Sequence, residues 1–198
     1  MEKHIPKLFG LVLSGGKSTR MGTDKGAISY HGIPQQEFLY HLLEGLCEQV
    51  FVSLREDQKN TLPKAIPTIL DKNEFKGPYN GLLSAQKEYP DAAWLVLACD
   101  LPLMDAFALK ELIDQRDSTK NATAFALRSH PLPEPLCAIW EPHALFASKS
   151  YLENGTSTCP RKFLINHNTK LVYPKNENVL LNANSMEEYH AAMAQISN

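Results

Sequence analysis

Strand-like and helix-like segments alternate along most of this chain, and that order limits its fold more than any other feature. Apolar, β-prone runs predict strands at residues 7–14, 50–54, 67–70, 94–99, 123–127, 136–140 and 170–173. Amphipathic patterns predict helices at residues 36–48, 79–89, 103–116, 142–151 and 185–195. This alternation favours a doubly wound, mostly parallel sheet with helices on both faces. The sequence therefore predicts one α/β domain over residues 1–198.

The first predicted strand leads into a glycine turn that is followed by three cations. The stretch is LSGGKSTRMGTDKG over residues 13–26, and its cations are Lys17, Arg20 and Lys25. Glycines let a backbone approach a ligand closely, and free N–H groups and cations both attract anions. Phosphate is the anion that this pattern favours, so we expect a nucleotide site near the N-terminus.

Two common phosphate-binding loops do not fit this stretch. The Rossmann fingerprint GxGxxG is absent, because Gly15 and Gly16 are adjacent and the next glycine is Gly22. A Walker A loop, GxxxxGK[ST], needs a glycine at position 11, where the chain has Leu11. The loop is therefore of another type.

Composition excludes several classes of function. A net charge of −2 argues against a broad electrostatic interaction with nucleic acid. The four cysteines include no CxxC pair and the seven histidines no HExxH spacing, which disfavours a zinc site. No apolar run approaches the roughly 20 residues of a membrane span, and the first residues do not resemble a signal peptide. We expect a cytoplasmic protein without a nucleic-acid or membrane partner.

Four motifs span nearly the whole chain. They are LSGGKSTRMGTDK at residues 13–25, Asp71 with GPYNG at 77–81, ACDLP at 98–102, and LNANS at 181–185. In this order they resemble the motifs of molybdenum cofactor guanylyltransferases, the MobA-like nucleotidyltransferases with their Rossmann-like fold. The first motif is similar to LAGGxSxRMGxDK, with Ser14 in place of the alanine.

The resemblance implies transfer of GMP from GTP to the terminal phosphate of molybdopterin, with Mg²⁺ as the cofactor and pyrophosphate as the product. The implied nucleotide-binding residues are Leu13, Ser14, Gly15, Gly16, Lys25, Asp71, Gly77, Pro78, Gly81 and Asp100. The implied catalytic residues are Arg20, Lys25 and Asp100, and the metal ligand is Asp100. On the acceptor side the resemblance places Asn182 and Asn184. Other cofactor-biosynthesis proteins are candidate partners.

The residue types agree with phosphoryl chemistry of this kind. A phosphate acceptor is already ionised at neutral pH, so it needs charge cancellation and in-line positioning rather than a general base. Asp100 follows a buried apolar strand, at the end of the sheet where open α/β folds bind ligands. Mg²⁺ is commonly held by one or two carboxylates together with phosphates and waters, so one aspartate is sufficient.

Several alternatives stay open at the level of single residues. Asp100 could cap a helix, although Asp105 is the better cap for the helix that follows. Asp71 could form a turn, and Asn182 and Asn184 could cap the last helix. Surface positions are expected for Arg128, His130 and Arg161, although they could line an acceptor pocket.

The motifs leave the substrates open as well. Arg55 stands where the family often has an asparagine that approaches guanine, so CTP remains an alternative nucleotide. A sugar or alditol phosphate is an alternative acceptor. A catalytically silent nucleotide-binding module is a third hypothesis, against which the intact Lys25 and Asp100 argue.

Overall fold

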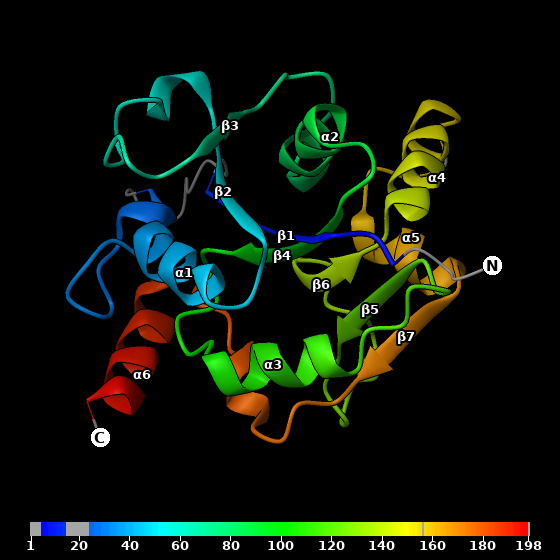
Figure 1. Cartoon of the computed structure of the whole chain (residues 1–198). Coiled ribbons are helices and arrows are strands. Elements are labelled where there is room, and N and C mark those ends of the chain that lie inside the picture. The colour runs from blue at the N-terminus through cyan, green and yellow to red at the C-terminus, as the bar shows by residue number, and fades with distance from the viewer. Residues whose placement is uncertain (1–4, 15–23, 156, 198) are drawn as a thin grey trace.

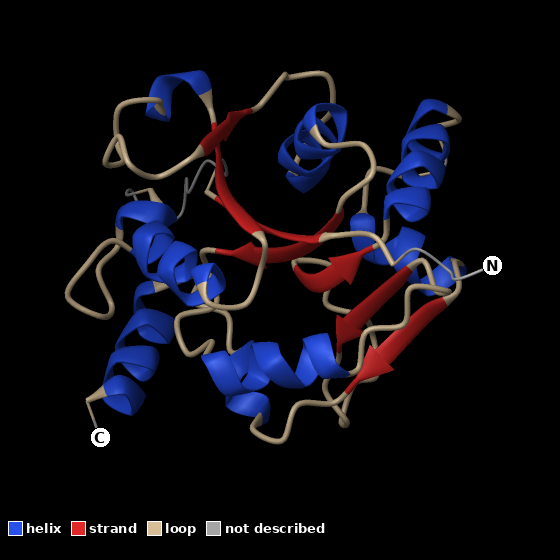
Figure 2. Cartoon of the chain, in the orientation of Figure 1, coloured by secondary structure: helices blue, strands red, loops and turns tan. Residues whose placement is uncertain are grey.

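Seven strands form one sheet in the order β3-β2-β1-β4-β6-β5-β7 among the residues that the structure describes. The structure is a computed structural model, and it describes residues 5–14, 24–155 and 157–197. The strands are β1 (Leu8–Leu13), β2 (Gln49–Leu54), β3 (Thr68–Leu70), β4 (Ala93–Ala98), β5 (Ala122–Phe125), β6 (Cys137–Trp140) and β7 (Thr169–Val172). Figure 2 shows them as one twisted layer between two groups of helices.

The sheet is mostly parallel, as the sequence predicts, and β6 is its antiparallel strand. Strand β1 pairs in parallel with both β2 and β4, whereas β6 pairs antiparallel with β4 and with β5. The chain therefore proceeds from β1 to β2 and β3 on one side, then crosses to β4 on the other. The carboxyl ends of β1 and β4 meet at this switch point, since Leu13 lies beside Ala98.

Helices cover both faces of the sheet, which confirms the predicted doubly wound arrangement (Figure 1). The α-helices in the described part of the chain are α1 (Gln35–Glu44), α2 (Pro78–Glu88), α3 (Ala106–Asp114), α4 (Pro142–Glu153), α5 (Pro160–Asn166) and α6 (Met186–Ile196). Helices α1 and α3 pack on one face, and α2, α4 and α5 pack on the other. Short 3₁₀ turns are η1 (Lys25–Ala27), η2 (Glu56–Gln58) and η3 (Glu177–Leu180).

Alternating side chains of β1 supply both layers of the core. Val12 packs with the apolar residues of α1 and α3, while Leu11 packs with those of α2 and α4. Both side chains are fully buried because successive residues of a strand point to opposite faces. Trp94 and Trp140 are also fully buried on the α2 side. The core thus holds β1 and β4 rigidly where their carboxyl ends meet.

Helix α5 has no counterpart among the sequence predictions. It is only seven residues long and begins with Pro160, after Cys159. A helix of two turns is too short to give a clear apolar period, although its Phe163 and Leu164 are buried.

Side chains cap the starts of α3 and α6, and the cap of α3 confirms the prediction for Asp105. The Asp105 side chain accepts the N–H of Ala108 at the start of α3, at 2.8 Å. The Ser185 hydroxyl accepts the N–H of Glu188 at the start of α6, at 3.2 Å. Across the described ranges, no helix combines the length and the hydrophobicity that crossing a membrane would require.

Candidate functional site

Lys25, Asp100 and Asn184 meet at the switch point, although they are far apart in the sequence. The Lys25 Nζ lies 3.6 Å from Asp100 Oδ2, and both side chains are only about a quarter exposed, at 24% and 22%. The same ammonium group donates a hydrogen bond to Asn184 Oδ1. The N–H of Ala183 donates to the main-chain oxygen of Asp100 at 2.9 Å, which holds the segment before α6 against the end of β4. The cluster can offer a cation to a phosphate and a carboxylate to a metal.

The backbone around Lys25 is held by the residues on either side of it. The Asp24 carboxylate accepts the N–H of Gly26 at 3.1 Å and so caps the turn η1. A Cβ atom at position 26 would lie 2.7 Å from Gln36 Oε1 and closer still to Ser14 Oγ. Glycine therefore lets this turn pack at the end of β1 without displacing the Ser14 and Gln36 side chains. The Ser14 hydroxyl itself donates to Gln36 Oε1 at 2.7 Å.

Asp71 lies at the end of β3 and is tied to the end of β2. The Ser53 hydroxyl donates to Asp71 Oδ1 at 2.6 Å, and the Asp71 N–H donates to the Leu54 carbonyl at 2.9 Å. Burial raises the pKa of Asp71, and the hydrogen bonds from Ser53 and Asn80 oppose that rise only in part. A carboxyl group with a raised pKa at the end of a strand is a candidate for a functional site.

The GPYNG motif shapes the start of α2. Gly77 precedes the helix with φ +63°, a conformation that favours glycine, and Pro78 occupies the first turn, where its missing N–H is not needed. At Gly81 an added Cβ would lie 2.8 Å from Leu13 Cδ2 and closer still to Ser53 Oγ. The second glycine therefore lets α2 lie directly against the ends of β1 and β2.

The remaining predicted residues fall into two groups. Leu13 ends β1 within this site and Ser14 follows it directly. Asn182 donates to the Leu180 carbonyl at 3.2 Å, two residues before Asn184. Three predicted residues, Gly15, Gly16 and Arg20, lie outside the residues that the structure describes.

Arg161 forms an ion pair near the same edge of the sheet. Its Nη2 lies 2.6 Å from Glu134 Oε2, and its Nε donates to the Pro133 carbonyl. Burial raises the pKa of Glu134, with a further contribution from the negative charge of Asp100, while the cation of Arg161 lowers it. The Glu134 side chain thus lies within electrostatic range of the cluster. His130 lies in a tight turn, where its N–H donates to the Leu127 carbonyl.

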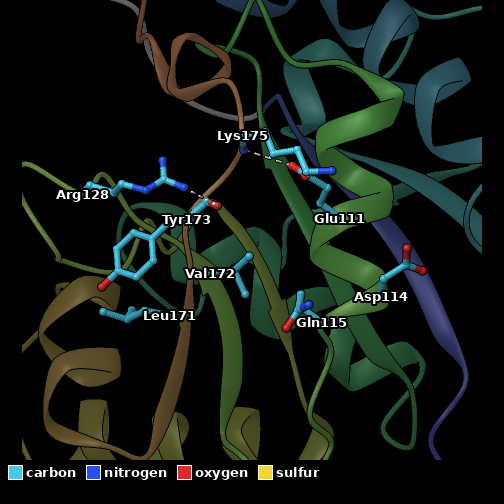
Figure 3. A pocket seen from close by; sticks show the side chains of 8 residues that line it. All are labelled: Glu111, Asp114, Gln115, Arg128, Leu171, Val172, Tyr173 and Lys175. Carbon is cyan, nitrogen blue, oxygen red and sulfur yellow. Dashed lines mark hydrogen bonds and ion pairs between the residues drawn. The ribbon is translucent and has the colours of Figure 1, made fainter.

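Arg128 lies in a separate groove between α3 and β7 (Figure 3). The groove has a volume of about 570 Å³ and is lined by Glu111, Asp114, Gln115, Arg128, Leu171, Val172, Tyr173 and Lys175. Its cations face carboxylates: Lys175 lies 3.3 Å from Glu111 and Arg128 lies 2.8 Å from Glu177. The groove is not lined by the predicted acceptor-binding residues Asn182 and Asn184.

Asp100, the predicted magnesium ligand, remains a candidate for that role. Within the described ranges, no three His, Cys, Asp or Glu side chains form a group that could hold a metal ion by themselves. Mg²⁺ does not require such a group, because substrate phosphates and waters complete its coordination. The partly exposed carboxylate of Asp100, beside the cation of Lys25, matches that arrangement.

Sequence reasoning did not find Gln58, which joins three parts of this site. Its Nε2 donates to the main-chain oxygen of Ser14 at 3.1 Å and to the Asp24 carboxylate, and its Oε1 accepts the N–H of Arg55 at 3.0 Å. Gln58 is only 4% exposed. It lies in the polar stretch REDQKN, so nothing in the local sequence indicates that it is buried.

Comparisons with known proteins show the family to which the chain belongs. Residues 10–170 match the family model described as the MobA-like NTP transferase domain. A molybdenum cofactor biosynthesis bifunctional protein of Synechocystis is 39% identical over 183 residues, which cover 92% of this chain and 52% of that protein. The chain thus spans about half the length of that relative.

Other relatives are closer to this chain in length. A molybdenum cofactor guanylyltransferase of Pseudomonas fluorescens is 30% identical over 187 residues, with 92% of each chain covered. The crystal structure of molybdopterin-guanine dinucleotide biosynthesis protein A from Archaeoglobus fulgidus has a TM-score of 0.79 and 19% identity, covering 96% of this chain and 98% of that one. That likeness shows the fold, and the sequence matches show the family. The chain belongs to the family of MobA-like NTP transferase domains.

Proposed function

We propose that this protein transfers GMP from GTP to the terminal phosphate of molybdopterin and releases pyrophosphate. The observation that supports this most is the cluster of Lys25, Asp100 and Asn184 at the switch point of the sheet. Relatives named molybdenum cofactor guanylyltransferase supply the choice of GTP and of the acceptor. The proposal assigns this cluster to phosphates and takes the substrates from those names.

Lys25 is the described cation that we assign to the triphosphate. Its ammonium group lies within the cluster rather than in bulk solvent, because only 24% of its side chain is exposed. An ammonium ion in a partly desolvated position stabilises negative charge on the leaving pyrophosphate more strongly than a solvated one does. Arg20, outside the described residues, would share this role.

Asp100 would hold Mg²⁺, which neutralises charge on the triphosphate and thereby lowers its repulsion of the acceptor phosphate. The carboxylate keeps its position because the Asp100 main-chain oxygen accepts the N–H of Ala183. Asn184 orients the Lys25 ammonium group through its Oδ1. The chain thus positions and neutralises, and the acceptor phosphate supplies its own nucleophilic oxygen.

Pyrophosphate release with each of GTP, CTP, ATP and UTP, with and without molybdopterin, tests the proposal. Turnover with GTP and molybdopterin is expected. Lys25→Ala and Asp100→Ala are each expected to lower kcat/KM about 10²-fold or more, as the loss of a transition-state electrostatic contact does. Lys149→Ala and Asp91→Ala are matched controls, because they remove the same charges from exposed positions elsewhere.

Each of the other outcomes would indicate a different function or a different site. Turnover with CTP, or with a sugar or alditol phosphate as acceptor, would replace the proposed substrates while keeping the site. Nucleotide binding without any turnover would indicate a silent module. If Lys25→Ala and Asp100→Ala behave like the two controls, the site is wrongly assigned.

A further inference from the structure

The side-chain amide of Gln58 uses both its nitrogen and its oxygen to join segments that meet beside Lys25. One amide group donates to Ser14 and to Asp24 and accepts from Arg55. Ser14 directly follows β1, whereas Asp24 begins the turn that carries Lys25, and nine residues separate the two in the sequence. Gln58 therefore ties the end of the central strand to the beginning of the lysine turn.

Asp24 transmits this contact to Lys25. Its Oδ2 accepts from Gln58, and its Oδ1 accepts the N–H of Gly26, so one carboxylate joins Gln58 to the turn η1. The Arg55 Nη2 also lies 3.8 Å from Asp24 Oδ2. Lys25 lies between Asp24 and Gly26, so the oriented carboxylate of Asp24 holds the backbone around Lys25.

We propose that Gln58 is a positioning residue for nucleotide transfer, which sets the Lys25 ammonium group before the nucleotide binds. The inference rests on the proposed function only for the identity of the ligand. Preorganisation of a cation lowers the cost of binding a triphosphate, because less of the chain must be ordered when the ligand arrives. Loss of Gln58 should therefore act on the nucleotide and leave the affinity for the acceptor unchanged.

Gln58→Leu removes the three hydrogen bonds and keeps a side chain of similar size. Gln86→Leu is the matched control, since Gln86 is also buried, at 5% exposure, but lies toward the far end of α2. The first measurement is hydrogen exchange of the Gly26 and Ala27 amides without any ligand. Because those amides donate to Asp24, we expect Gln58→Leu to speed their exchange about tenfold or more, and Gln86→Leu to leave it unchanged.

The second measurement is steady-state kinetics at a temperature where both variants are folded. We expect Gln58→Leu to raise the nucleotide KM about tenfold or more and to leave the acceptor KM unchanged. A purely structural role of Gln58 would lower the melting temperature of Gln58→Leu without this division between the two substrates.

Gln58→Glu keeps the shape and gives a second, independent test should Gln58→Leu not fold. Its carboxylate can still accept from Arg55, but it repels Asp24 until one of the two carboxyl groups binds a proton. The measured quantity is the nucleotide KM of this variant divided by that of the unaltered protein at the same pH. This ratio should fall toward 1 as the pH is lowered from 8 to about 5.

The outcomes separate this inference from the proposed function. Faster exchange at Gly26 in Gln58→Leu supports the positioning role even if the unaltered protein turns over no nucleotide, in which case the proposed function fails alone. Exchange and nucleotide KM in Gln58→Leu equal to those in Gln86→Leu would overturn the positioning role while the proposed function stands. A change confined to the acceptor KM would also overturn it.

Discussion

Replacing Gly81 with alanine tests whether α2 must lie directly on the ends of β1 and β2. The new Cβ would lie 2.8 Å from Leu13 Cδ2, 3.2 Å from Ser53 Cβ and closer still to Ser53 Oγ. Neither strand can move away easily, because both are buried in the sheet. Either α2 shifts outward or Ser53 rotates and loses its 2.6 Å hydrogen bond to Asp71.

The expected change in the free energy of unfolding has one stabilising and two destabilising contributions. Alanine stabilises a helix interior by about 1 kcal/mol relative to glycine. Overpacking costs about 1–3 kcal/mol, and a lost hydrogen bond to a carboxylate costs about 1.5–3 kcal/mol. We expect a net loss of about 2 kcal/mol, which lowers the Tm of a chain of this size by roughly 4–8 °C. The nucleotide KM should rise as well, because Asp71 loses a partner.

Thermal unfolding with two companion variants isolates the cause. Gly45→Ala is the matched control, since Gly45 ends α1 with φ −80° and nothing lies within 4 Å of its added Cβ. Its stability should stay within about 0.5 kcal/mol of the unaltered protein. Ser53→Ala should recover part of the stability that Gly81→Ala loses, because it removes the nearest atom. The reasoning is refuted if Gly81→Ala is as stable as Gly45→Ala, or if Ser53→Ala does not reduce its cost.

Two further substitutions test the electrostatics. Burial raises the pKa of Asp71, so its contribution to stability is complete below the unfolded pKa, near pH 4, and is lost as the pH rises through the folded value. Asp71→Asn should therefore raise Tm at pH 8 but not at pH 4, and it should weaken nucleotide binding. A change in Tm that is the same at both pH values would contradict this reasoning. Arg116 holds the 1% exposed carboxylate of Glu141 at 2.7 Å, so Arg116→Ala should cost about 3–5 kcal/mol by leaving a buried charge unpaired. Arg116→Met combined with Glu141→Leu should recover most of that stability in thermal unfolding, and a double variant no more stable than the single one would contradict the argument.

The parts of the site that follow strand ends could be predicted from the sequence. The apolar run before Asp100 is buried on both faces, so the position of the strand and its end can be recognised from local composition. Asp71 directly follows β3, which the sequence also predicts as a strand, so its place at a strand end could be predicted as well. The parallel order of β1 and β4 then brings the end of β1 beside that of β4, as the doubly wound pattern requires.

The direction of β6 depends on a connection that the local patterns do not describe. Residues 126–136 join β5 to β6 and contain three prolines, so they cannot form the helical crossover that a parallel pair needs. The antiparallel pairing follows from that connection. It brings Glu134 to the same edge of the sheet as the end of β4.

The contacts between side chains of the site could not be predicted, because they join residues far apart in the chain. Asn184 lies 159 positions from Lys25, and Gln58 lies 34 positions from Asp24. The amide of Asn184 holds the Lys25 ammonium group, while the cap of α6 is Ser185. Periodicity and propensity indicate which residues are buried and which share a face, but they do not indicate which polar groups meet across the fold.

The central claim is that the carboxyl ends of β1 and β4 hold the triphosphate against Lys25, with the metal on Asp100. A crystal structure with a non-hydrolysable GTP analogue and Mn²⁺ tests it most directly, because the anomalous signal of manganese locates the ion. We predict phosphate oxygens within hydrogen-bonding distance of Lys25 Nζ and manganese bound to an Asp100 carboxylate oxygen. Phosphates bound in the groove between α3 and β7, or manganese bound away from Asp100, would contradict the account.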